Sequence, residues 1–150
     1  MRRTHTSVPF ILCAAIALCM MSCEKNCRYD AFDGFWRVDE VTDLTTGITS
    51  SGNARLFMSF EYHLVKLSWL PENRTPGFLG YEYIASCKEE DGSVKFGIFY
   101  KYREEDIPAP AEYVASFGIP YNQPSSFEYS FNEGKLILEN PTTRLLLTKY

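Results

Sequence analysis

The side chains that could carry catalysis are few in this chain. Once the predicted leader described below is removed, His63 is the one histidine left, and no nucleophile-elbow sequence surrounds it. A Ser-His-Asp triad would have to be built on this single residue, and no two-histidine or histidine-cysteine metal cluster can be assembled. We therefore expect His63 to be a turn or surface residue, and we predict no catalytic residue and no metal site.

Carboxylates occur in two runs, Glu89-Glu90-Asp91 and Glu104-Glu105-Asp106. Paired carboxylates can act in acid-base catalysis or bind calcium. Adjacent acids in a hairpin turn or a charged loop are more typical of a solvated surface, and we interpret both runs in this way. The sequence also lacks a phosphate-binding glycine loop and any cofactor fingerprint. We predict a protein that is not an enzyme and needs no cofactor.

The first 22 residues have the features of a signal peptide. Arg2 and Arg3 precede an apolar run from Val8 to Met21, which at 14 residues is shorter than the roughly 20 that a spanning helix needs. The run ends in Met20-Met21-Ser22-Cys23, which resembles the lipobox of bacterial lipoproteins. This resemblance implies that Cys23 is acylated and becomes the mature N-terminus; the alternative is ordinary secretory cleavage that leaves Cys23 as a free thiol.

Lipid attachment would place the protein in the bacterial cell envelope, on the outer membrane, facing either the periplasm or the cell surface. Residues 23–33 are predicted to form a polar tether, and residues 34–150 a single domain. Loss of Arg2 and Arg3 takes the net charge from -4 to -6. This acidic balance argues against a nucleic-acid partner, which requires a concentrated basic face.

Two cysteines remain after the leader and Cys23 are set aside, namely Cys27 and Cys87. An even pair in an oxidising compartment is compatible with a disulfide. Such a bridge would close a loop of about 60 residues and could stabilise the fold by roughly 4 kcal/mol. Two separate thiols remain the alternative, because sequence does not give geometry.

Alternation of apolar residues predicts eight strands and one short helix. The strands are expected at 34–44, in two parts of 55–70 that divide near 61–63, and at 78–87, 93–102, 127–131, 135–139 and 144–149. A bulge near Asp39-Glu40 would return Val41 to the inner face of the first strand. Residues 45–53 are expected to form a turn-rich connection, and Arg103 to Asp106 a charged loop. The pattern from Ala111 to Phe117 predicts a helix of two to three turns that caps or flanks the strands.

Eight strands are the number that closes a small antiparallel up-and-down barrel. The aromatic residues assigned to its inner face are Trp36, Phe60, Trp69, Tyr83, Phe96, Tyr100, Phe127 and Tyr129. In a barrel of this size they either fill the core or surround one small ligand.

The chain resembles the lipocalin-like lipoproteins of Bacteroidetes-type bacteria. The resemblance is carried by Cys23 with its tether, by Gly34-Phe35-Trp36, by Gly134-Lys135-Leu136 and by the terminal strand Arg144 to Lys149. It implies an all-β calycin-type barrel in which Trp36 plugs the floor, with a basic residue of the last strand, Arg144, packed over it. The chain departs from true lipocalins because it lacks their Thr-Asp-Tyr loop motif and a helix after the last strand.

Two functions follow from this interpretation. The first is binding of a small apolar or amphipathic ligand inside the barrel by the inner aromatic residues. The second is a filled barrel that serves as an interaction or scaffold lipoprotein, and docks an envelope protein through the loops around Pro71 to Gly77 and Arg103 to Pro110. The two differ in whether the barrel contains a cavity.

Overall fold

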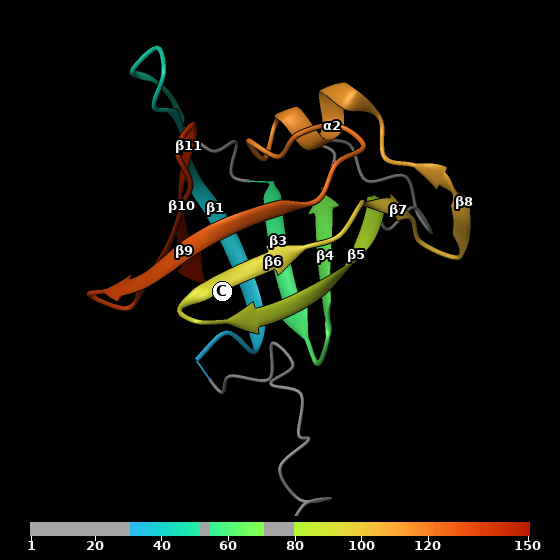
Figure 1. Cartoon of the computed structure of the whole chain (residues 1–150), viewed down its shortest axis with the longest axis horizontal. Coiled ribbons are helices and arrows are strands. Elements are labelled where there is room, and N and C mark those ends of the chain that lie inside the picture. The colour runs from blue at the N-terminus through green and yellow to red at the C-terminus, as the bar shows by residue number, and fades with distance from the viewer. Residues whose placement is uncertain (1–30, 52–54, 71–79) are drawn as a thin grey trace, which may run out of the picture.

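Eight antiparallel strands close into a barrel, as the sequence predicts. The computed structural model describes residues 31–51, 55–70 and 80–150 (Figure 1). Around the barrel the strands follow the order β1 (Gly34–Asp43), β3 (Leu56–Glu61), β4 (Leu64–Trp69), β5 (Tyr81–Glu90), β6 (Ser93–Phe96), β9 (Ser125–Asn132), β10 (Lys135–Glu139) and β11 (Thr143–Lys149). Pairing of β11 with β1 closes the ring and leaves none of these eight as a free edge.

The first strand contains the predicted bulge. Its register against β11 shifts between Val38 and Glu40, so two residues of β1 oppose one of the partner. Val38 and Val41 are both buried as a result, although their spacing along the chain is odd. The connection after β1, expected to consist of turns, instead contains the short strand β2 (Ile48–Ser51), which pairs with the end of β1. The prediction holds for the turn at 44–47 and was wrong for the strand that follows.

The strand expected at 93–102 is broken. After β6 the chain leaves the ladder, then forms β7 (Tyr100–Lys101) and β8 (Glu104–Pro108), so the expected charged loop at 103–106 lies mostly in a strand. The interruption shifts the alternation of faces, and Phe99 is buried in place of Tyr100. Tyr100 pairs with Ile84 on the outer face, which corrects its predicted inward orientation. Together β7 and β8 form a ribbon beside the barrel (Figure 1).

One short helix, α2 (Ala111–Ala115), lies across one end of the barrel (Figure 1). Its position over the strands confirms the prediction, but it is shorter than expected. Gly118 follows it with φ +63°, and a Cβ at that position would lie 2.4 Å from Cγ2 of Thr143. Both the left-handed conformation and the close approach of β11 therefore favour glycine. In the described ranges no helix has the length and apolar character to span a membrane.

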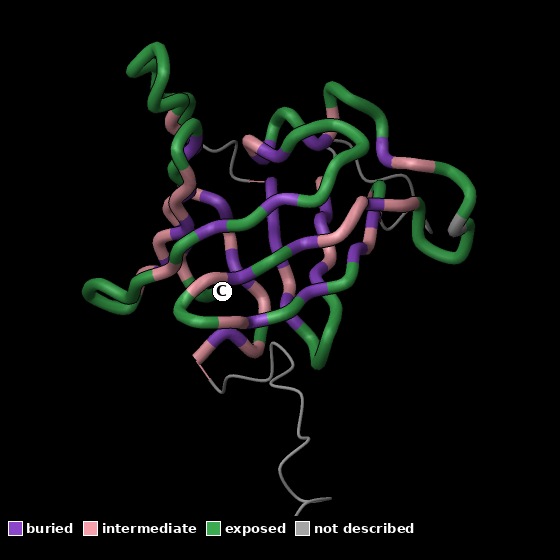
Figure 2. Tube along the Cα trace, in the orientation of Figure 1, coloured by how far each residue is buried: buried purple, intermediate pink, exposed green. Residues whose placement is uncertain are grey.

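Buried residues recur along the barrel strands (Figure 2), and their side chains form one core cluster in the middle of the barrel. Every barrel strand contributes buried inward residues, and Phe117 after α2 adds its ring at the end that the helix covers. The fully buried members include Val38, Met58, Val65, Leu67, Phe96, Phe117, Phe127, Leu136, Leu138, Leu145 and Leu147. Burial of this much apolar surface is the main stabilising contribution to a small barrel. Space for a ligand is therefore to be sought at the two ends.

Candidate functional site

One end of the barrel, called here the closed end, is sealed around Trp36 near the start of β1. The indole Nε1 donates a hydrogen bond of 2.8 Å to the backbone oxygen of Phe32. The Phe32 ring packs against Phe60 at 5.4 Å and against Tyr129 at 4.6 Å between ring centroids. Trp36 is only 2% exposed. This arrangement agrees with the expected role of Trp36 as the plug of the floor.

The basic residue over Trp36 is Lys149 rather than Arg144. The Lys149 Nζ lies 5.5 Å from the centroid of the indole ring, within the range of a cation-π interaction. Register explains the difference, because Lys149 pairs with Trp36 whereas Arg144 pairs with Thr42 near the other end of β1. Arg144 instead forms an ion pair with Glu139. The Arg144 prediction was therefore wrong.

Gly34 gives the Lys149 side chain room to reach the indole. It has φ +130°, a conformation that other residues rarely adopt, and a Cβ there would lie 3.1 Å from the Lys149 Cε. The spacing of glycine and tryptophan in Gly34-Phe35-Trp36 thus has a physical reason at this end: the glycine lies under the side chain that packs on the tryptophan.

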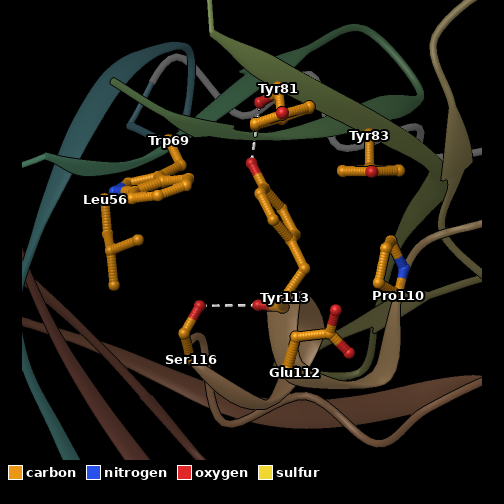
Figure 3. Close-up of a pocket in the computed structure, with 8 residues that line it drawn as sticks. All are labelled: Leu56, Trp69, Tyr81, Tyr83, Pro110, Glu112, Tyr113 and Ser116. Carbon is orange, nitrogen blue, oxygen red and sulfur yellow. Dashed lines mark hydrogen bonds between the residues drawn. The ribbon is translucent and has the colours of Figure 1, made fainter. Parts of the chain in front are cut away.

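The opposite, open end contains a pocket of about 600 Å³ beneath α2 (Figure 3). Its walls come from the beginnings of β3 and β5, the end of β4, and α2 with its flanking residues. The lining residues are Leu56, Trp69, Tyr81, Tyr83, Pro110, Glu112, Tyr113 and Ser116. The lining is mostly aromatic and apolar, with a small number of polar groups, which is the usual character of a small-molecule site.

Tyr113 fixes α2 to the strands. From the helix its ring points between Trp69 and Tyr83, and its hydroxyl donates a 2.7 Å hydrogen bond to the backbone oxygen of Tyr81 (Figure 3). The ring also lies 4.5 Å from that of Tyr83. Burial raises the pKa of the Tyr113 hydroxyl well above its usual range. It remains a neutral donor at physiological pH and holds the helix over the pocket.

Aromatic faces and one carboxylate define the chemistry of the pocket. Trp69 and Tyr81 are stacked, with centroids 6.2 Å apart and planes inclined by 14°. Burial is also the main cause that raises the pKa of Tyr83; Lys101 opposes the shift, and Tyr81 and Glu112 add to it. Among the described residues that line the pocket, Glu112 is the one ionised group. The arrangement can hold a compact apolar body beside a negative charge.

A family model described as a lipocalin-like domain matches residues 18–150. The chain belongs to this lipocalin-like family. A lipocalin-like protein from Bacteroides uniformis has 16% identity, a TM-score of 0.59, and coverage of 80% of this chain and 99% of its own. An uncharacterised protein from Bacteroides eggerthii has 15% identity, a TM-score of 0.62, and coverage of 79% and 99%. These two likenesses show the fold alone. No curated protein matches the chain.

The lipocalin-like barrel separates the predicted ligand-binding residues into groups. Trp69 and Tyr83 line the pocket, whereas Tyr100 lies on the outer face. Tyr129 is partly buried beside Phe32 near the closed end. The others are packed in the core or the closed end and are at most 2% exposed: Trp36, Phe60, Phe96 and Phe127. The structure thus places two of the predicted side chains at the open-end pocket.

Sequence reasoning missed the contribution of α2 to the pocket. Tyr113 was recognised by its helical spacing with Val114 and Phe117, which indicated only that the helix packs on the barrel. Val114 and Phe117 do pack on the barrel, but Tyr113 lines the pocket, and Glu112 beside it supplies the charge. An acid next to an aromatic residue on a capping helix was the available signal.

The remaining predicted positions are placed as follows. His63 is exposed in the turn between β3 and β4, and the described residues contain no group of three potential metal ligands. Cys87 is buried and disulfide-bonded. Cys23 and Cys27 lie outside the described residues, so lipid attachment and the Cys27–Cys87 pairing stay predictions.

Glu89 differs from the expected solvated surface, because it faces inward on β5 in the same alternation as Cys87 and is only 6% exposed. The Tyr129 hydroxyl donates a 3.3 Å hydrogen bond to its Oε1. The other acids of this run behave as expected in part: Glu90 forms an exposed ion pair with Lys95, and Asp91 is in the turn.

Proposed function

We propose that this lipocalin-like protein binds a small apolar or amphipathic molecule in the pocket at the open end of its barrel. The observation that carries the proposal is the cavity of about 600 Å³ with aromatic walls under α2. Ligand sites for small molecules commonly have volumes of roughly 300–1,000 Å³ and predominantly apolar linings. The middle of the barrel is packed with side chains, so we place the ligand in this pocket rather than in the core.

The proposal includes a lipid anchor on Cys23 and a place on the outer membrane, with no enzymatic activity. It is supported by the leader sequence and by the packing of Phe32, which leads into β1, at the closed end. The tether therefore joins the barrel at the end opposite the pocket. An anchored barrel would hold the closed end toward the lipid and leave the pocket accessible from the aqueous side.

The first test is native mass spectrometry of a chain that begins at Glu24. This chain keeps every described strand, the helix and all their pairings, which lie between Gly34 and Lys149, and it needs no detergent. Extra mass that is lost on denaturation would support a bound ligand. A bare mass, combined with no binding in the fluorescence titration below, would contradict the proposal.

The two tryptophans provide matched reporters for that titration. Trp36→Phe leaves Trp69, in the pocket, as the single indole, and Trp69→Phe leaves Trp36 at the closed end. Titration with dodecan-1-ol, a neutral amphipathic probe, should change the emission of Trp69. The same additions should leave the emission of Trp36 unchanged, because that ring is buried at the far end.

The alternative function is docking of an envelope protein partner. It is favoured by the β7–β8 ribbon beside the barrel, in which the exposed fractions of Tyr102 and Ile107 are 46% and 47%. Single exposed apolar residues are common on protein surfaces, so this support is weaker than that of the pocket. The Pro71 to Gly77 loop lies outside the described residues. Two results together would favour this function: capture of one envelope protein by the parent chain but not by Ile107→Ser, and a native mass without any bound ligand.

A further inference from the structure

We propose that the open-end pocket selects a cationic amphiphile, whose apolar body ends in an ammonium group, over an alcohol or carboxylate of the same body. This inference rests on the proposed function and adds the charge of the ligand. It depends on three observations: the aromatic rings that line the pocket, the position of Glu112, and the cation-π contact between Lys149 and Trp36 at the closed end.

The ring faces at the pocket suit an ammonium group. Trp69 and Tyr83 line it from neighbouring strands, and the ring of Tyr113 lies between them (Figure 3). The face of an aromatic ring carries negative electrostatic potential and attracts a cation within about 6 Å of its centroid, tryptophan most strongly. The same faces contact methylene groups well, so they accommodate both parts of such an amphiphile.

Glu112 adds a full negative charge at the edge of this aromatic group. It lies in the first turn of α2, directly before Tyr113, and lines the pocket. None of the described lining residues is basic. The nearby Lys101 influences Tyr83, but its Nζ lies 2.6 Å from an oxygen of Glu104 and is paired there. A ligand carboxylate would be repelled by Glu112, whereas an ammonium group would be attracted.

The hydroxyl groups of Tyr113 and Ser116 are already hydrogen-bonded within the chain, so they do not offer a site for an anion. The Tyr113 hydroxyl donates to the Tyr81 backbone oxygen, and the Ser116 hydroxyl donates 2.6 Å to the backbone oxygen of Tyr113. To use either of these two donors, an anionic head would have to break the bond that the donor already makes. A cation needs none, because ring faces and a carboxylate supply its contacts.

The closed end gives an internal precedent for the same chemistry. There the chain supplies its own cation, because Lys149 lies over Trp36. In the described part of the chain no cation is placed over the ring of Trp69. Trp69 brings the same ring type to the wall of the pocket.

The test compares dodecyltrimethylammonium, dodecan-1-ol and dodecanoate, below their micellar concentrations, by the emission of Trp69 in the Trp36→Phe chain from Glu24. We expect the cation to bind about fivefold more tightly than the alcohol, and dodecanoate to bind more weakly than either. Glu112→Gln should weaken binding of the cation about threefold and leave the alcohol within twofold, since the carboxylate is exposed.

Glu133→Gln is the matched control, because it removes the same charge from an exposed turn between β9 and β10 at the closed end. It should change none of the affinities. Equal binding of all three probes, tighter binding of dodecanoate, or an equal effect of both variants would overturn the charge preference while leaving the proposed function intact. A guest found by native mass spectrometry without any response to the cation would also overturn it. No response to any probe and a bare mass would contradict both proposals.

Discussion

The two tryptophans lie at opposite ends of one barrel and have opposite surroundings. Trp36 has its Nε1 bonded to Phe32, its face covered by Lys149 and almost no exposed surface. Trp69 is partly buried, stacks on Tyr81 and faces a cavity. The same residue type thus completes the fold at one end and remains available to a ligand at the other.

Local sequence explains why the ends differ. At the closed end, Gly34 makes room for Lys149, and the register between β1 and β11 brings that lysine to Trp36. At the open end a helix takes the place of a plug, and the Tyr113 hydroxyl holds it to two strands, 2.7 Å from the Tyr81 oxygen and 3.4 Å from the Leu67 oxygen. A short helix that lies over the strand ends leaves space beside Tyr113, whereas direct packing of rings does not.

The largest expected effect is loss of the plug. Trp36→Ala should lower the free energy of unfolding by about 3 to 5 kcal/mol, because it leaves a cavity and an unbonded carbonyl at Phe32. Trp69→Ala should cost only about 1 to 2 kcal/mol while it weakens ligand binding. Urea unfolding of both variants measures the difference. Equal losses of stability would contradict the distinction between the two ends.

An intermediate effect on stability is expected at Gly118, just after the end of α2. Gly118→Ala places a methyl group 2.4 Å from Thr143 in a left-handed conformation, and should destabilise the fold by about 2 kcal/mol. Gly134→Ala has a similar φ of +78° but meets nothing within 4 Å, so about 1 kcal/mol is expected there. Thermal unfolding and probe binding should both be affected more by the first. A greater effect of the second would show that α2 is not held by this contact.

The smallest expected effect is the loss of stability at acidic pH that Asp39 causes. Asp39 is partly buried, which opposes ionisation, but hydrogen bonds from Thr148 and Arg37 and the charges of Arg37 and Lys135 hold its pKa below the ordinary 3.8. Its contribution is therefore fully present above the pKa of the unfolded chain and is lost as pH falls through the lower folded value.

Asp39→Asn should consequently reduce stability near neutral pH, and the gap from the parent chain should close in acid below about pH 4. Asp43→Asn is the control at the open end, since hydrogen bonds from Thr45 lower the Asp43 pKa but this carboxylate is fully exposed. Urea unfolding at a series of pH values should show a smaller gap for Asp43→Asn. A gap for Asp39→Asn that widens in acid would contradict the assigned direction.

Sequence alone predicted the barrel well because its strands follow simple alternation. The bulge at Asp39, the eight strands and the capping helix all came from local patterns. The errors arose where long-range contacts decide the outcome. Gly97 lies against Ser86, and the ladder is interrupted there, which no alternation reveals; Phe99 consequently replaces Tyr100 on the inner face.

The pocket was predicted only in part for a related reason. An inward-facing ring can be packed in the core or can line a cavity, and the difference depends on what covers the end of the barrel. Trp69 and Tyr83 were recognised as inward, but their contact with α2 joins positions more than 25 residues apart along the chain. Likewise, the choice of Lys149 over Arg144 required the register of β1 and β11.

That register joins the first barrel strand to the last, and the amide of Tyr150 completes it with a 2.8 Å hydrogen bond to the oxygen of Phe35. In the unfolded chain, β1 gains its partner for this edge only when segments 100 or more residues apart meet. Contacts between such distant segments form late and slowly. We therefore expect closure of the barrel to be a late step of folding, after the hairpins whose strands are neighbours along the chain.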